Sequence, residues 1–238
     1  SVVRRNLKRF ARFDSVRYAV KANSNLAVLR ALREGGARCE VVSAGEIERA
    51  RAAGFTPGEM VYTADLMDRR ARTLVGDLKL HVNAGSASML EDVATVCGPG
   101  QVTLRVNPGF GEGHDRKVTT GGAHSKHGIW HEELPAVRER AEALGLRVTG
   151  LHVHIGSGLE GRFIERTVEA MEPAVALFGE TLMRVSCGGG MSFPYRPDAA
   201  PFDIERFAAT WLAGRERWSR SLGRTIELEA EPGRVLVA

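Results

Sequence analysis

One lysine stands directly after an apolar, strand-like run, where its amine could enter a pocket. The run ends at Val20, and Lys21 follows it. A lysine surrounded by apolar groups has a lowered pKa, and its neutral amine forms a Schiff base with a carbonyl compound. The alternative, which is the commoner case for a single lysine, is a loop side chain that faces solvent. The residues around Lys21 therefore decide between a nucleophile and a surface charge.

Two histidines, His152 and His154, alternate with apolar residues in the segment Leu151-His152-Val153-His154-Ile155. Side chains two positions apart on a strand face the same side, so both imidazoles should share one face. Such a pair could bind a metal ion, contact an aromatic cofactor or substrate, or be satisfied within the fold. The pattern alone leaves all three interpretations open.

Two further groups of residues are suited to anions. Gly188, Gly189 and Gly190 are consecutive, and a glycine run lets the backbone approach a ligand and offer amide hydrogens to a phosphate. Glu231 and Arg234 lie three residues apart. Arginine suits phosphate or carboxylate groups, and a buried carboxylate needs a cationic partner. A turn without a ligand and a surface ion pair are the respective alternatives.

The elements expected to position these residues alternate between short β-type runs and amphipathic helices. The predicted strands span residues 16–20, 39–42, 60–63, 78–82, 102–106, 148–155, 182–186 and 226–230. The predicted helices cover residues 26–33, 44–53, 132–144, 162–178 and 203–222. This alternation predicts parallel strands joined by right-handed crossovers, and eight strands favour a closed (β/α)8 TIM barrel of the α/β class. We expect residues 1–238 to form one barrel domain.

Two local features stand out within this pattern. The run Ser43-Ala44-Gly45-Glu46 has the spacing of a capping box, which opens the predicted helix at residue 44. The segment 107–130 is rich in Gly, His and Lys and has little periodicity. Long loops of this kind are usually functional, so we expect this segment to contribute to the site.

A TIM barrel places its active site at the carboxyl ends of its strands, and the candidate residues fall there. Lys21, the histidines, the glycine run and the Glu-x-x-Arg motif all reach one rim. Glu40, Glu46 and Arg105 lie at two further strand ends. A pyridoxal 5'-phosphate site requires such a set: an amine for the aldehyde, amides for the phosphate, a ring that stacks on the cofactor and an acid opposite the pyridine nitrogen.

The composition narrows the function class. The 33 Lys and Arg residues against 29 Asp and Glu give a net charge of +4, and their scatter along the chain argues against nucleic-acid binding. The three cysteines suggest neither a disulfide framework nor a zinc site. Because no apolar run reaches membrane-span length and no signal peptide is evident, we expect a cytoplasmic protein without membrane association. The start at Ser1 and the apolar end suggest a fragment of a longer chain.

The motifs resemble those of the fold-type III pyridoxal-phosphate decarboxylases, the alanine-racemase-like barrel group, and within it the bacterial diaminopimelate decarboxylases. They follow the order of the family along nearly the whole chain. The matching motifs are Tyr18-Ala19-Val20-Lys21-Ala22-Asn23, Val42-Ser43-Ala44-Gly45-Glu46-Ile47, Val82-Asn83-Ala84-Gly85-Ser86, Arg105-Val106-Asn107-Pro108-Gly109, Ser125-Lys126-His127-Gly128-Ile129-Trp130, His152-Val153-His154-Ile155-Gly156-Ser157-Gly158, Gly188-Gly189-Gly190 and Glu231-Pro232-Gly233-Arg234.

The resemblance assigns a role to each candidate. It implies that Lys21 binds the cofactor aldehyde, that His154 stacks on the pyridine ring and that Glu231 pairs with the ring nitrogen. It assigns Arg234 to the phosphate and the substrate carboxylate. The remaining cofactor-binding residues would be Ser157, Gly188, Gly189, Gly190 and Gly233. The supporting shell would be Glu40, which stands where relatives often carry Asp, with Glu46 and Arg105; no metal is implied.

The activity implied is decarboxylation of meso-2,6-diaminopimelate, a small amino-acid substrate, to L-lysine and carbon dioxide. Ornithine, a D-amino acid or carboxynorspermidine are the alternative substrates. Relatives continue into a C-terminal β-domain, which supplies a Cys-Glu pair and a tyrosine across a homodimer. Because that domain is absent from this sequence, we expect the chain alone to bind cofactor better than it turns over substrate.

Three other interpretations compete with this one. A single-domain, non-catalytic pyridoxal-phosphate-binding protein would have this length, although its serine-methionine-glycine-methionine turn is missing. A metal-dependent hydrolase would use His152 and His154, but it would leave Lys21 and the glycine run unexplained. Alanine racemases place an arginine, where this sequence has Glu231, against the pyridine nitrogen.

Overall fold

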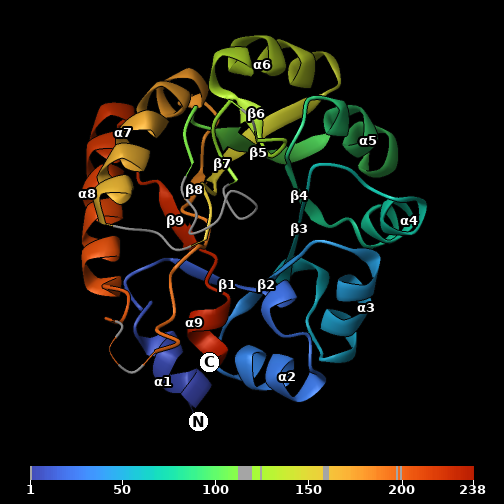
Figure 1. The fold of residues 1–238 in the computed structure, drawn as a ribbon. Helices are drawn as coiled ribbons and strands as arrows, with labels where there is room; N and C mark the ends of the chain where they lie inside the picture. Colours follow the sequence, from blue (N-terminus) through green and yellow to red (C-terminus); the bar gives the residue numbers. More distant parts are fainter. Residues whose placement is uncertain (1, 112–119, 124, 158–160, 197, 199) are drawn as a thin grey trace.

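The computed structural model describes residues 2–111, 120–123, 125–157, 161–196, 198 and 200–238. Its centre is a closed barrel of eight parallel strands (Figure 1), which confirms the predicted (β/α)8 fold. The barrel strands are β1 Ser15–Ala19, β2 Arg38–Val41, β3 Met60–Ala64, β4 His81–Ala84, β5 Gly100–Asn107, β7 Leu146–Val153, β8 Arg184–Ser186 and β9 Glu227–Ala230. They pair in chain order, and β9 closes the ring by pairing with β1 through Ser15 and Glu229. A short strand, β6 Ile129–Trp130, pairs with the end of β5.

Helices surround the strands on the outside (Figure 1), as expected when each parallel strand is followed by a crossover. The α-helices are α1 Val2–Lys8, α2 Leu26–Glu34, α3 Ala44–Ala52, α4 Arg69–Leu78, α5 Ser88–Cys97, α6 Leu134–Ala143, α7 Gly161–Phe178, α8 Ile204–Leu222 and α9 Arg234–Val237. Among the described residues, the short 3-10 helices are η1 Val20–Ala22, η2 Pro57–Glu59 and η4 His131–Glu133.

The long helix α8 illustrates how the sequence fixes these elements. The Asp203 side chain accepts a hydrogen bond from the backbone N–H of Arg206 and so begins the helix, while Gly223, in the left-handed conformation, ends it. Phe207 and Trp211, four residues apart, are both buried against the barrel. The pattern of caps and apolar positions therefore determines both the length and the inward face of α8.

The predicted strand at 78–82 is wrong at its beginning. Helix α4 continues to Leu78, and Lys79 adopts a left-handed conformation with φ of 51° that ends the helix. The strand therefore begins only at His81. The other predicted strands agree with the observed ones except for a few residues at their ends, and β6 was not predicted.

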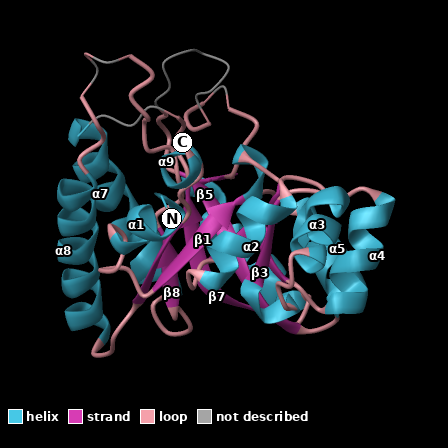
Figure 2. Ribbon diagram, turned by 90° about the horizontal axis from the view of Figure 1, so that it is seen from below, coloured by secondary structure: helices cyan, strands magenta, loops and turns pink. Residues whose placement is uncertain are grey.

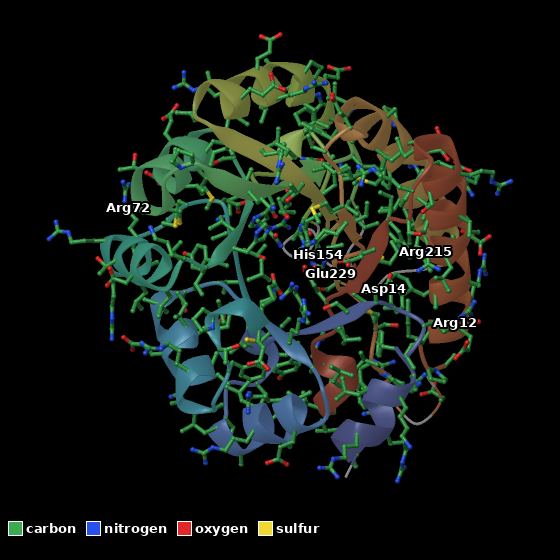
Figure 3. All side chains as sticks on the ribbon, turned by 180° about the vertical axis from the view of Figure 1, so that it is seen from behind. Arg12, Asp14, Arg72, His154, Arg215 and Glu229 are labelled. Atoms are coloured by element: carbon green, nitrogen blue, oxygen red, sulfur yellow. The ribbon has the colours of Figure 1, made fainter. Side chains whose placement is uncertain are left out.

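The amino-terminal end of the barrel is closed by polar side chains. Arg17 on β1 donates two hydrogen bonds to Glu229 on β9, at 3.0 and 2.9 Å, and both side chains are buried. His81 on β4 lies 2.8 Å from the Thr103 hydroxyl, and burial lowers the pKa of this imidazole to about 4. Figure 3 shows Glu229 inside the ring of strands, whereas Arg72 lies outside that ring, on helix α4. These polar side chains leave the opposite, carboxyl end free for a cavity.

The loops that follow the strands gather with α9 at the carboxyl end of the barrel (Figure 2). The two ends of the chain meet there, because the Asn6 side chain on α1 donates a hydrogen bond to the Leu236 carbonyl on α9 at 3.2 Å. Among the described residues, none of the helices has the length and apolar character that crossing a membrane requires.

Candidate active site

The carboxyl ends of the strands surround a cavity of about 330 Å³. The predicted site residues that line it are Lys21, Glu40, Arg105, His152, His154, Ser157, Gly189, Gly190, Glu231, Gly233 and Arg234. A second cavity, of about 260 Å³, lies between α6, the beginning of β7 and the end of α7, and it contains none of these residues. The cavity at the carboxyl end is therefore the candidate active site, and residues from distant parts of the chain meet in it.

Lys21 reaches this cavity because the chain turns immediately after β1. The 3-10 helix η1 begins at Val20, and the Tyr18 hydroxyl donates a hydrogen bond to the Asn23 carbonyl at 3.0 Å, which fastens the turn. The Lys21 side chain is 53% exposed, and its Nζ lies 3.7 Å from Oε1 of Glu40. The amine therefore stands at the mouth of the cavity, with a buried carboxylate beneath it.

Glu40 and Glu46 differ in their position relative to the cavity. Glu40 on β2 is buried, and its burial raises the pKa of the carboxyl group, although the nearby Lys21 opposes that effect. Glu46 does not line the cavity: its carboxylate accepts a hydrogen bond from the Val42 N–H at 2.8 Å. Ser43 accepts the Glu46 N–H at 3.3 Å, as the capping-box spacing predicts. Glu46 thus holds the beginning of α3 beside the site.

Of the two histidines, which both face the barrel interior, His154 is held by the backbone of the glycine run. The backbone N–H of Gly189 donates to Nδ1 of His154 at 3.2 Å. Burial lowers the pKa of His154 well below its usual value, and the positive charges of Arg105 and Lys21 add to the effect. His154, which Figure 3 labels inside the barrel, is therefore a neutral imidazole with a fixed ring orientation.

Glu231 follows β9 and accepts hydrogen bonds from two other strands. Nε2 of His152 on β7 lies 2.8 Å from Oε2, and the Ser186 hydroxyl at the end of β8 donates to Oε1 at 2.8 Å. Burial alone would raise the pKa of Glu231, but the charge and hydrogen bond of His152 and the bond from Ser186 lower it to about 2. Glu231 is therefore a buried carboxylate that stays ionised.

His152 and His154 have different hydrogen-bond partners, and this bears on whether the pair could bind a metal ion. A metal site built on the pair would need both rings and at least one further ligand. His152 instead bonds Glu231, and His154 bonds the backbone of Gly189. Within the part of the chain that the structure describes, no group of three or more His, Cys, Asp or Glu side chains is arranged to hold a metal ion.

Gly189 and Gly190 form a wall of the cavity from bare backbone, whereas Gly188 does not line the cavity and lies directly before them. A Cβ atom on Gly188 would lie 2.2 Å from the Val153 carbonyl oxygen, and one on Gly189 would lie 2.4 Å from the Glu231 carbonyl oxygen. Gly188 and Gly190 also have φ of 63° and 94°, which glycine adopts most readily. Any side chain here would push the ends of β7, β8 and β9 apart, so the backbone itself borders the ligand space.

Two arginines place positive charge at opposite sides of the cavity. Arg105 on β5 is buried, and burial lowers the pKa of its guanidinium while Asp65, Glu40 and Glu231 oppose that effect. Arg234 begins α9 and donates a hydrogen bond to the Tyr195 hydroxyl at 3.0 Å. The cavity therefore combines one amine and two guanidinium groups with the carboxylates of Glu40 on β2 and of Glu231, directly after β9.

The sequence analysis did not predict two features near the site: the role of Ser186 and the contact between His127 and Asp65. Ser186 gave a weak signal, because it ends β8 two residues before Gly188. The contact between His127 and Asp65 gave none, because the residues are far apart in the chain; it joins the segment 107–130 to the end of β3. Gly85 leaves room for it, since a Cβ there would lie 2.2 Å from Oδ1 of Asp65. Residues 112–119 and 124 of the predicted functional loop lie outside the described residues.

Comparison with known proteins gives a consistent result. The family model for the pyridoxal binding domain of pyridoxal-dependent decarboxylases matches residues 1–238. The diaminopimelate decarboxylase of Escherichia coli K12 is 44% identical over 241 residues, and that of Streptomyces coelicolor is 45% identical over 242 residues. Both alignments cover 100% of this chain but only 57% and 55% of the relatives.

Solved structures agree with these relatives. A crystal structure of a diaminopimelate decarboxylase superimposes with a TM-score of 0.93 at 45% identity, covering 100% of this chain and 57% of that one. The Helicobacter pylori diaminopimelate decarboxylase mutant complexed with L-lysine has a TM-score of 0.89 at 25% identity, covering 100% and 62%. The chain thus spans little more than half the length of the proteins it matches.

Proposed function

The chain belongs to the pyridoxal-dependent decarboxylases, through their pyridoxal binding domain, and on this premise we propose that it is the cofactor-binding barrel of a diaminopimelate decarboxylase. The full-length protein would convert meso-2,6-diaminopimelate to L-lysine and carbon dioxide. The names of relatives at 44% and 45% identity along the entire chain support this substrate. The observation that carries the proposal is the convergence of Lys21, His154 and Glu231 on one cavity.

The cavity has the size and the chemical groups that pyridoxal phosphate requires. Its volume of about 330 Å³ lies within the range of small-molecule sites. The amine of Lys21 and the carboxylate of Glu231 both line it, so groups for an aldehyde and a basic ring nitrogen are present. Any Cβ on Gly188 or Gly189 would collide with neighbouring backbone, which leaves backbone as the wall where a phosphate would lie.

Each residue of the cavity then has a task in holding the cofactor. Lys21 would hold the cofactor through its aldehyde carbon, with loss of water, and Glu40, whose carboxylate lies 3.7 Å from the Lys21 amine, would accept the proton that the amine must lose. His154 would lie against the ring as a neutral imidazole. Glu231 would accept a hydrogen bond from the protonated ring nitrogen. The phosphate is held by Ser157, Gly188, Gly189, Gly190, Gly233 and Arg234.

Bound pyridoxal phosphate supplies a ring that accepts the electron pair left on the substrate's α-carbon when carbon dioxide departs. An ionised Glu231 would hold the ring nitrogen protonated and so favour this chemistry. Arg234 lies at the mouth of the cavity, where a guanidinium suits the carboxylate of an amino-acid substrate. Arg105, buried beside Glu40 and Glu231, balances the carboxylates, and Glu46 supports the beginning of α3.

We also propose that residues 1–238 form a single domain, that the full-length protein is a homodimer and that it works in the cytoplasm. The dimer is what the family resemblance implies. A reducing compartment fits Cys39, Cys97 and Cys187, which are all free thiols in the structure.

The test is a decarboxylation assay of the full-length protein with pyridoxal phosphate. Carbon dioxide release is measured with meso-2,6-diaminopimelate, ornithine, carboxynorspermidine and a basic D-amino acid. We expect diaminopimelate to have the highest kcat/KM and L-lysine to be its product. A higher kcat/KM with another amino acid would overturn the substrate, and release of no carbon dioxide from any of them would favour a non-catalytic binding protein.

A further inference from the structure

His152 has a specific relation to Glu231 that the cofactor roles above do not use. Its Nε2 lies 2.8 Å from Oε2 of Glu231, and the side chains of both residues are no more than 3% exposed. The second carboxylate oxygen accepts the Ser186 hydroxyl at 2.8 Å, and that hydroxyl accepts the Gly188 N–H at 3.2 Å. Two strands on the same side of the barrel therefore hold one carboxylate by both of its oxygens.

The chemistry of this bond fixes the proton on His152. An ionised carboxylate accepts hydrogen bonds and cannot donate them, so the hydrogen between His152 and Glu231 belongs to Nε2. Nδ1 of His152 is buried and has no hydrogen-bond partner among the described residues. The bond to Glu231 is therefore the hydrogen bond through which this ring acts among the described residues.

The other charged groups of the cavity act on the Glu231 carboxylate through their charge and not through hydrogen bonds. Lys21 and Arg105 favour a negative charge on Glu231, whereas the buried Glu40 opposes it. The structure gives no hydrogen bond from either cation to the Glu231 carboxylate; among the residues it describes, the side-chain donors are His152 and Ser186. Charge-assisted hydrogen bonds in a buried site are short, directional and strong.

We propose that His152 is a positioning residue: its Nε2–H, together with the Ser186 hydroxyl, keeps the Glu231 carboxylate ionised and oriented for the protonated ring nitrogen of pyridoxal phosphate. This inference rests on the proposed function, because it assigns a purpose to the carboxylate only if that cofactor is bound. It explains why the first histidine of the His-x-His motif is buried beneath the second and does not share a ligand with it.

The experiment compares pyridoxal phosphate with its 1-deaza analogue, in which a C–H group replaces the ring nitrogen. Dissociation constants of both are measured by equilibrium dialysis with the full-length protein and with H152L and H152Q. We expect the wild-type protein to prefer pyridoxal phosphate, and H152L to reduce that preference about tenfold. H152Q should restore most of it, because the glutamine amide can donate to Glu231.

Controls separate this effect from general damage to the fold. H81L removes another imidazole of the barrel interior, one that bonds Thr103 outside the cavity, and should leave the preference at the wild-type value. S186A removes the second donor and should also lower the preference, so it provides the test if H152L does not fold. A preference unchanged in H152L or, failing that, in S186A would overturn the inference, as would equal weakening of both ligands.

The same measurements distinguish this inference from the proposed function. A wild-type protein that binds neither ligand would overturn the proposed function and this inference with it. A wild-type protein that binds pyridoxal phosphate, beside variants with an unchanged preference, would overturn only the role of His152.

Discussion

The pKa values of two buried glutamates of the cavity shift in opposite directions because their neighbours differ. Burial raises the pKa of Glu40, and its nearest cation, Lys21, is half exposed. Burial also acts on Glu231, but two hydrogen-bond donors reverse its effect and lower the pKa. Pairs of acids with diverging pKa values are typical of active sites, where one group must exchange a proton and the other must keep its charge.

The low pKa of Glu231 predicts a specific dependence of stability on pH. Its pKa falls from 4.5 to about 2 on folding, so its ionised form stabilises the native state above pH 4.5, and this contribution is lost as the pH falls from there toward 2. We expect the difference in unfolding free energy between wild type and E231Q to shrink by about 2 kcal/mol between about pH 6 and about pH 3. Urea unfolding of the cofactor-free, full-length protein measures this difference.

The matched control is E172Q on the surface of α7. Glu172 is paired with Arg217 but half exposed, and an exposed ion pair contributes little to stability. The unfolding free energies of E172Q and wild type should therefore stay nearly parallel over the same pH range. A constant difference between wild type and E231Q would contradict the low pKa of Glu231.

At the scale of residues, the sequence predicted which side chains meet but not how they bond. Lys21, His154 and Glu231 were placed at one rim because strand ends can be located from apolar runs. The hydrogen bond between His152 and Glu231 joins residues 79 positions apart and depends on the order of the strands around the barrel. The alternation of strands and helices predicts that order, but it does not predict the depth in the barrel at which each side chain lies, so the bond itself could not be predicted.

At the scale of elements, the end of β8 is joined to the end of β9 by close backbone contact. The Glu231 N–H donates to the Gly188 carbonyl at 2.8 Å, and Gly189 lies against the Glu231 carbonyl. Both contacts lie at the edge of the cavity. A shift of the glycine backbone would therefore also move Glu231.

This contact predicts a large effect of one methyl group. In G189A the added Cβ would lie 2.4 Å from the Glu231 carbonyl oxygen, so the strand ends must separate. We expect a loss of about 1–3 kcal/mol in unfolding free energy and at least about tenfold weaker binding of pyridoxal phosphate. Denaturant unfolding and equilibrium dialysis of the full-length protein measure the two effects.

Gly45 in α3 provides the control substitution. No atom lies within 4 Å of a Cβ built there, and alanine is the better helix former. G45A should therefore leave the unfolding free energy equal to or slightly above the wild-type value and leave cofactor binding unchanged. If G189A were as harmless as G45A, the close contact between the strand ends would not be a constraint on the site.

Element boundaries were predictable where local chemistry marks them. The Ser43 cap begins α3 as expected, because Ser43 accepts a backbone N–H of the first turn. The beginning of β4 was misplaced, since α4 ends on the left-handed Lys79, a conformation that residues other than glycine adopt rarely. The strand β6 has only two residues and no alternation, so its pairing with β5 could be found only from the folded barrel.

At the scale of the whole molecule, the alternation of strands and helices was enough to predict the barrel. Eight apolar runs separated by helices leave few alternatives to a closed parallel sheet, and closure brings their ends together. Figure 2 shows the consequence, since the loops after the strands gather at one end. The sequence did not reveal the polar layer at the opposite end, because Arg17 and Glu229 are brought together only by the pairing of the first and last barrel strands.

The central claim is that Lys21 is the residue that binds pyridoxal phosphate covalently. It is tested most directly by incubating the full-length protein with the cofactor, reducing it with borohydride and mapping the modified peptide by mass spectrometry. We predict one modified lysine, Lys21, and no modification in K21A. Modification of a different lysine, or an unmodified Lys21 in protein that has bound the cofactor, would contradict the account.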